Sequence, residues 1–174
     1  MNQNRCIFLD RDGVLNVERG DYTYRPEDFE LEERVPEALA LLKQYGYLLI
    51  VITNQGGIGK KRYTKQDMAL CHEKLQQECN HLLDAIYYAP SHPSFSESLS
   101  RKPGSLLFEK ALARFQIDPA QSWMVGDQLR DLEAAAKVGI RSVLVGQPQA
   151  DYPRKARNLL EAAQLIVGES ERAP

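Results

Sequence analysis

The chain has 174 residues, of which 43% are hydrophobic and 26% are charged, and its formal net charge is -2. This length is enough for one ordinary domain and short for two. The small net charge gives no electrostatic basis for binding nucleic acid. No apolar run approaches the roughly 18 residues that suggest a membrane span. We therefore expect a single domain over 1–174 that binds neither nucleic acid nor a membrane.

The cysteines and the N-terminus point to the cellular compartment. Cys6, Cys71 and Cys79 form no CxxC pair, and a short polar segment leads directly into the first apolar run. We expect no signal peptide, and an odd number of cysteines then favours reduced thiols in a cytoplasmic protein. The helical spacing of Cys71 and Cys79 favours packing in the core. A monomer is expected.

Strands and helices are expected to alternate along the chain. The apolar run Cys6–Leu9 predicts a buried strand that ends at Asp10. Further strands are expected at 47–52, 85–88, 123–126 and 141–145, and helices after Pro36, Thr64, Pro103 and Asp127. A helix near 155–163, a short apolar run at 165–167 and a frayed tail from 168 are expected to complete the fold. This order predicts an α/β fold, with a parallel sheet between helices on both faces.

Candidate functional residues lie at the ends of expected strands and at the start of an expected helix. Asp10 and Asp12 follow the first strand, Thr53 ends the second, Asp127 follows the fourth, and Lys102 precedes a helix. Ligands of open parallel sheets bind just beyond the carboxyl ends of the strands. Residues two apart in an extended segment point to the same side, so the two leading acids can converge. We expect one site at this edge, overhung by the polar stretch 16–33.

Each of these residue types suits one part of phosphoryl transfer. Asp10 can be a nucleophile that forms an acyl phosphate, and Asp12 can serve as general acid and then general base. Repulsion between clustered carboxylates calls for a cation, and Mg²⁺ commonly binds one or two carboxylates together with phosphate and water. The Thr53 hydroxyl, backbone N–H groups and the Lys102 ammonium can hold the phosphate oxygens.

A purely structural role competes with each functional one. Asp10 and Asp12 can be ordinary turn residues, and Lys102 can be a solvated surface lysine. Asp127 can cap a helix, whereas Asp131 can be a first-turn helix acid or can support a metal from a second shell. Suitable residues at the ends of four successive elements together favour the functional interpretation.

The motifs at 10–14, 53–54, 102–103 and 126–131 match, in order, the four signatures of the haloacid dehalogenase (HAD) phosphatases. The chain resembles this family from its first expected strand to its fifth. The resemblance implies a HAD-like Rossmannoid fold, and the spacing leaves no room for a large cap domain. It implies Asp10 as nucleophile, Asp12 as general acid/base, and Thr53 and Lys102 as phosphate ligands. It also implies Mg²⁺ held by Asp10, Asp127 and the backbone carbonyl of Asp12.

Segments 8–16, 52–58 and 101–104 are similar to the D-glycero-D-manno-heptose-1,7-bisphosphate 7-phosphatases and to the related histidinol-phosphate phosphatases. The first resemblance implies that Arg101 binds substrate, and a guanidinium suits a second phosphate. Asn54 and Gln55 can contact sugar hydroxyls. The heptose bisphosphate is therefore the expected substrate, and histidinol phosphate or another small phosphomonoester is the alternative. A phospho-accepting or inactive binding module is a third possibility, but it does not need Asp12.

One segment departs from these relatives. They usually carry a structural zinc loop with three cysteines and a histidine between the third strand and the Arg-Lys-Pro segment. In this chain the corresponding stretch, 88–101, has alanine and serine in place of the cysteines and keeps only His92. A single histidine cannot build a tetrahedral zinc site. We expect no structural zinc.

Overall fold

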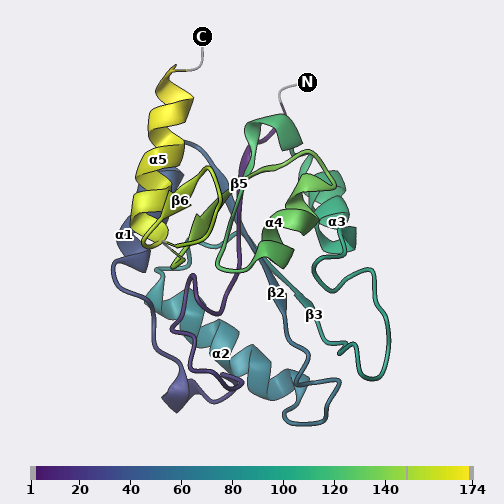
Figure 1. Ribbon diagram of the computed structural model, residues 1–174. Helices are drawn as coiled ribbons and strands as arrows, with labels where there is room; N and C mark the ends of the chain where they lie inside the picture. The colour runs from purple at the N-terminus through teal and green to yellow at the C-terminus, as the bar shows by residue number, and fades with distance from the viewer. Residues whose placement is uncertain (1–2, 148, 173–174) are drawn as a thin grey trace.

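A computed structural model describes residues 3–147 and 149–172, and its centre is a six-stranded parallel sheet (Figure 1). The strands are β1 (Cys6–Leu9), β2 (Leu48–Asn54), β3 (Ala85–Ala89), β4 (Trp123–Gly126), β5 (Arg141–Val145) and β6 (Lys155–Ala156). Their order in the sheet is β3-β2-β1-β4-β5-β6. The first strand is therefore central, between β2 and β4. The predicted parallel α/β sheet is confirmed.

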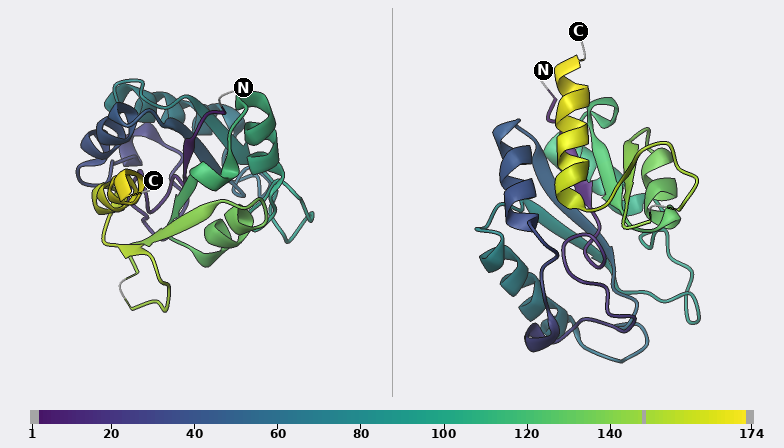
Figure 2. Two further views of the ribbon diagram at one scale, coloured as in Figure 1. Left: turned by 90° about the horizontal axis from the view of Figure 1, so that it is seen from above. Right: turned by 60° about the vertical axis from the view of Figure 1, so that its left-hand side comes forward.

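Helices cover both faces of the sheet (Figure 2). α1 (Val35–Gln44), α2 (Lys65–Glu78) and α5 (Leu159–Arg172) lie on one face, and α3 (Leu106–Phe115) and α4 (Leu129–Ala136) lie on the other. Side chains alternate along a strand, so β1 supplies Ile7 and Leu9 to the first core and Phe8 to the second. Short 3₁₀ helices occupy Pro26–Asp28 and Pro119–Gln121.

Local sequence signals explain where several elements begin. Every residue of β1 is buried, as expected for a central parallel strand with an uninterrupted apolar sequence. Thr64 and Asp67 form a reciprocal capping box at the start of α2, because each side chain accepts a hydrogen bond from the other residue's backbone N–H. Cys71 and Cys79 are both buried, as their spacing predicted.

The prediction for the end of the chain was wrong in its boundaries. Lys155–Ala156 is a short strand paired with β5, and one helix then runs from Leu159 to Arg172. The apolar run at 165–167 belongs to this helix because Ile166 and Val167 lie on the same buried face as Leu159 and Ala163. The helix continues through residues 168–172, and the hydroxyls of Tyr45 and Tyr47 are hydrogen-bonded to side chains of its last two turns. Residues 173–174 lie outside the described residues.

The start of α3 also differs from the prediction. The helix begins at Leu106, not at Pro103, because Gly104 and Leu106 donate backbone hydrogen bonds back to Arg101 and Leu99 and close a turn. The connections after β1, β2 and β3 all lie at one edge of the sheet, opposite the two termini (Figure 1). Within the described residues there is no large cap, and no helix is long and apolar enough to cross a membrane.

Candidate functional site

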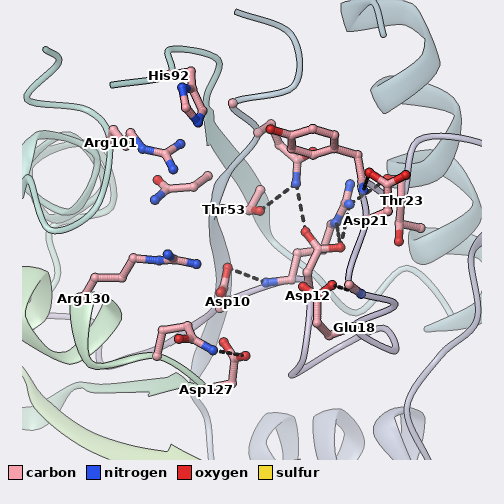
Figure 3. Close-up of a pocket in the computed structure, with 17 residues that line it drawn as sticks. Asp10, Asp12, Glu18, Asp21, Thr23, Thr53, His92, Arg101, Asp127 and Arg130 are labelled. Atoms are coloured by element: carbon pink, nitrogen blue, oxygen red, sulfur yellow. Dashed lines mark hydrogen bonds and ion pairs between the residues drawn. The ribbon is translucent and has the colours of Figure 1, made fainter. Parts of the chain in front are cut away.

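The carboxyl ends of the strands open into a cavity of about 420 Å³ (Figure 3). Seven residues singled out from the sequence line it, namely Asp10, Asp12, Thr53, Asn54, Gln55, Arg101 and Asp127. Lys102 and Asp131 are buried and contact this wall through Asp10 and each other. The stretch 16–33 contributes Glu18 and residues 20–23 to the lining, so it does overhang the cavity.

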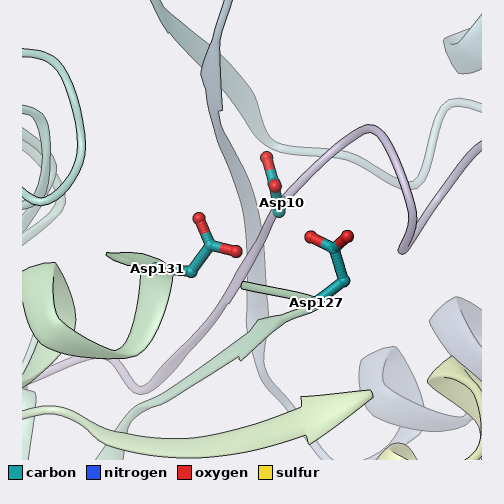
Figure 4. A group of neighbouring side chains, drawn as sticks. All are labelled: Asp10, Asp127 and Asp131. Atoms are coloured by element: carbon teal, nitrogen blue, oxygen red, sulfur yellow. The ribbon is translucent and has the colours of Figure 1, made fainter. Parts of the chain in front are cut away.

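Three carboxylates lie close together (Figure 4), and two of them, Asp10 and Asp127, line the cavity. Oxygen atoms of Asp10, Asp127 and Asp131 all lie within 4.8 Å of one another. Asp127 does not cap α4, because Gln128 is the capping residue. Oδ1 of Asp127 is buried and has no hydrogen-bond partner in the described part of the chain. An all-oxygen cluster with an unpartnered carboxylate oxygen fits a hard divalent cation such as Mg²⁺.

Gly13 allows the turn after β1 to approach Asp127. Its φ is +82°, and a Cβ at this position would lie 2.5 Å from Oδ2 of Asp127. Glycine reaches positive φ without the steric cost of a side chain. This position therefore serves both the turn and the placement of the carboxylate.

Lys102 is the buried cation of the site. Its Nζ lies 2.8 Å from Oδ1 of Asp10 and 2.7 Å from Oδ1 of Asp131, and it donates a hydrogen bond to the carbonyl of Ile52 at 2.7 Å. Burial alone would lower the pKa of Lys102, but the two carboxylates outweigh it and raise the pKa. The surface-lysine alternative is thereby excluded, since the side chain is only 1% exposed.

Burial within this cluster raises the pKa of Asp10. Burial, and then the charge of Asp131, raise the pKa of Asp10 to about 7 despite the opposing effect of Lys102. Burial also raises the pKa of Asp127. One buried ammonium therefore faces three carboxylates, and a bound divalent cation would offset the excess negative charge.

Asp12 is held by neighbours on both of its oxygens. Oδ1 accepts hydrogen bonds from the Arg11 guanidinium at 2.7 Å and from Nδ2 of Asn16 at 3.0 Å. Oδ2 accepts from Nε2 of Gln55 at 3.1 Å. The Arg11 side chain is almost fully buried and also donates to the carbonyl of Thr23, so it links Asp12 to the overhanging stretch.

The two amides after Thr53 make contacts inside the protein. Asn54 pairs with the backbone of Lys102, because its Oδ1 accepts from the Lys102 N–H at 2.9 Å and its Nδ2 donates to the Lys102 carbonyl at 3.1 Å. Gln55 donates to Oγ1 of Thr53 at 2.9 Å as well as to Asp12. These bonds give both side chains a structural task, and their contact with a sugar stays a prediction.

Two arginines extend into the cavity on the side away from Asp12, Glu18 and Asp21 (Figure 3). Arg101 donates to the carbonyl of Ser91 at 3.2 Å. Burial, and then the charge of Arg130, lower the pKa of Arg101. The sequence did not reveal Arg130, which occupies a variable position of the motif at 126–131; its place one residue before Asp131 was the only signal.

The HAD-hydrolase-like family matches residues 99–162. A D-glycero-beta-D-manno-heptose-1,7-bisphosphate 7-phosphatase of Haemophilus ducreyi is 39% identical over 147 residues, covering 79% of this chain and 80% of the relative. The enzyme of the same name from Neisseria meningitidis serogroup B is 35% identical over 167 residues, covering 93% and 89%.

A solved structure is also similar over nearly the whole chain. It is the D,D-heptose 1,7-bisphosphate phosphatase from B. bronchiseptica, complexed with magnesium and phosphate. The TM-score is 0.87 at 28% sequence identity, with 95% of this chain and 99% of that chain covered. The resemblance inferred from the motifs is confirmed, and it favours a hydrolase over a phospho-accepting or inactive module. The chain is a HAD-type phosphatase, a phosphoric monoester hydrolase, and belongs to the family of the heptose-1,7-bisphosphate 7-phosphatases.

Proposed function

We propose that this phosphatase hydrolyses the 7-phosphate of D-glycero-D-manno-heptose 1,7-bisphosphate, with Mg²⁺ and through an aspartyl phosphate on Asp10. The observation that carries the proposal is the position of Asp10, buried against Lys102 and two further carboxylates at the base of a cavity that two arginines also line. The names of the curated relatives support the substrate. The magnesium and phosphate of the B. bronchiseptica complex support the cofactor.

The residues that would hold Mg²⁺ are Asp10, Asp127 and the backbone carbonyl of Asp12, with Asp131 in a supporting position. The donors are all oxygens, and Oδ1 of Asp127 has no partner in the described residues. When bound, Mg²⁺ would neutralise negative charge on the transferring phosphoryl group. We propose no structural zinc, because the 88–101 stretch offers only His92.

The chain's own residues account for the proton and bond changes. A carboxylate oxygen of Asp10 attacks phosphorus, the bond from phosphorus to the ester oxygen breaks, and Asp12 gives its proton to that leaving oxygen. Asp12 then takes a proton from the water that attacks the aspartyl phosphate, which releases inorganic phosphate and restores Asp10. The Thr53 hydroxyl and the charge of Lys102 stabilise the phosphoryl oxygens.

The arginines are the features that favour a bisphosphate. Guanidinium groups bind phosphate through paired hydrogen bonds. Arg101 and Arg130 line the same cavity as Asp10, and their mutual repulsion would be relieved by an anion between them. The cavity volume is in the range typical of small-molecule sites. We propose that the 1-phosphate of the substrate binds here.

The test compares phosphate release from both anomers of the heptose bisphosphate with release from histidinol phosphate, at matched concentrations with Mg²⁺. A strong preference for the heptose, mostly lost in Arg101→Ala, is expected; preference for histidinol phosphate would refute the substrate but not the chemistry. Turnover retained by Asp10→Asn would refute the nucleophile. The proposal treats the chain as one domain acting as a cytoplasmic monomer. Size-exclusion chromatography with light scattering would check the oligomeric state.

A further inference from the structure

A tyrosine outside the four motifs is bonded to the residue that contacts Asp12. The Tyr63 hydroxyl donates a hydrogen bond to Oε1 of Gln55 at 2.6 Å. Both side chains are buried, with residue exposures of 6% and 2%. The tyrosine belongs to the connection between β2 and α2, eight residues beyond Gln55. None of its atoms lines the cavity directly.

This hydrogen bond completes the set of partners available to the Gln55 amide. Its Nε2 donates to Oδ2 of Asp12 and to Oγ1 of Thr53, so both N–H donors are used. Its oxygen accepts only from Tyr63 among the described residues. Rotation of the amide by half a turn would place its oxygen against the Asp12 carboxylate, which is unfavourable. The tyrosine hydroxyl therefore reinforces the single orientation in which Gln55 donates to Asp12.

The Asp12 oxygen that Gln55 contacts is the one suited to proton transfer. Oδ1 already accepts from the charged Arg11 guanidinium and from Asn16. Oδ2 has only Gln55 as a hydrogen-bond partner in the described structure, so it has room to carry a proton toward the cavity. The position of this oxygen depends on the position of the Gln55 amide.

The tyrosine ring is itself held firmly. Tyr24 stacks on it with 5.0 Å between ring centroids and an interplanar angle of 4°, and Tyr22 packs against it edge-on at 5.7 Å. On another side, a Cβ at Gly57 would lie 2.1 Å from the ring, so only glycine allows this contact. These contacts on the ring fix the position of the Tyr63 hydroxyl relative to Gln55.

We propose that Tyr63 is a positioning residue that, through Gln55, aligns Oδ2 of Asp12 for protonation of the leaving oxygen. The inference rests on the proposed function, because it needs Asp12 to be the general acid. Without the hydroxyl, Oε1 of Gln55 is left buried without a donor, and the amide turns toward another partner. Asp12 then pivots on its Arg11 contact, and Oδ2 loses its alignment with the substrate.

The test uses the leaving group as the readout. An alkoxide needs a proton as it departs, whereas p-nitrophenolate is a stable anion that leaves without one. We would measure kcat/KM, which reports only on steps through formation of the aspartyl phosphate, for an alkyl phosphate and for p-nitrophenyl phosphate. The alkyl substrate is the heptose bisphosphate, with histidinol phosphate in its place if the heptose is not hydrolysed.

Tyr63→Phe keeps the ring stack and removes only the hydroxyl. General acid catalysis contributes about 10²–10⁴-fold, so a misaligned acid should lower kcat/KM for the alkyl substrate about tenfold and leave the aryl value within about twofold. Tyr24→Phe is the matched control, since its hydroxyl makes no hydrogen bond within the described chain. It should leave the ratio of the two values unchanged.

A second variant guards against poor folding of the first. Gln55→Met should also lower the alkyl value more than the aryl value, on top of a decrease shared by both substrates, because it removes the contact with Thr53 as well as the one with Asp12. The double variant should be no worse than Gln55→Met alone, because both residues act along one path. In Tyr63→Phe, a parallel loss on both substrates, or no change, would overturn the inference while leaving the phosphatase intact. A wild-type protein that hydrolyses neither substrate would instead refute the proposed function.

Discussion

Replacing Lys102 with methionine would show how far the buried charges depend on one cation. The substitution keeps an unbranched side chain, shorter by one atom, and removes the ammonium that lies 2.8 Å from Asp10 and 2.7 Å from Asp131. These three side chains are 1%, 9% and 0% exposed. Removing one partner of a buried ion pair costs about 3–5 kcal/mol, because the other charge remains buried and unpaired. We expect a loss of this size in the free energy of unfolding at pH 8 in EDTA.

The free energy of unfolding that Lys102→Met loses should become smaller as the pH falls. Burial and Asp131 raise the folded-state pKa of Asp10 to about 7, above its ordinary value of 3.8. A raised carboxyl pKa contributes stability that is complete below the ordinary value and is lost as the pH rises through the folded value. Without Lys102 this pKa rises further, so Asp10 is already neutral at pH 6. Mg²⁺ at pH 8 should also recover part of the loss, because it supplies the missing positive charge.

Urea unfolding monitored by fluorescence of the single tryptophan, the buried Trp123, would measure these values. Lys43→Met is the matched control, since Lys43 pairs with Asp84 where both side chains are more than a quarter exposed. Such pairs typically contribute about 0–1 kcal/mol. If Lys102→Met cost no more than Lys43→Met, the cluster would not depend on its buried ammonium, and the electrostatic reasoning would fail.

Two further predictions concern the turn after β1 and the contact of Arg11 with His72, whose Nε2 lies 3.4 Å from the Arg11 guanidinium. Gly13→Ala should raise the Mg²⁺ concentration needed for half-maximal activity about tenfold, because its Cβ would meet Asp127 at 2.5 Å; Gly139→Ala, also at positive φ but in open space, should not. His72→Gln should reduce the stability lost between pH 7 and 5 by about 1–2 kcal/mol. Burial and then Arg11 lower the pKa of His72 to about 4, so the wild type loses stability as the pH falls below 6.5. Equal urea-midpoint shifts in the two proteins would contradict this.

The parallel sheet was predictable because its signal is local. A strand buried on both faces needs an uninterrupted apolar run, and Cys6–Leu9 is such a run. The same reasoning predicted that Asp10, Thr53 and Asp127 would lie close together, since each lies at or just beyond the end of a strand, and all three line one cavity. The boundaries of α5 were harder, because Lys155–Ala156 is a strand only through its pairing with β5, which its own two residues do not signal.

The contacts between motifs could not be predicted, because they depend on side-chain directions. Asn54 and Gln55 stand next to Thr53, and their polarity suggested contacts with a sugar. In the structure, Asn54 makes two hydrogen bonds with the backbone of Lys102, and Gln55 donates hydrogen bonds to both Thr53 and Asp12. These internal contacts could be found only from three-dimensional geometry, and the contact of either amide with a sugar stays a prediction.

Asp131 shows why some alternatives could not be separated from the sequence. From the sequence, Asp131 is either a first-turn helix acid or a residue that supports a metal from a second shell. In the structure its Oδ2 accepts from the N–H of Gln128 at 3.1 Å, as a first-turn acid does, and its Oδ1 pairs with Lys102 at 2.7 Å. Its support of a metal stays a prediction. Gly126 permits this arrangement, since a Cβ there would lie 2.5 Å from Cβ of Asp131. The start of α4 and the charge balance around Asp10 are therefore coupled through a single side chain.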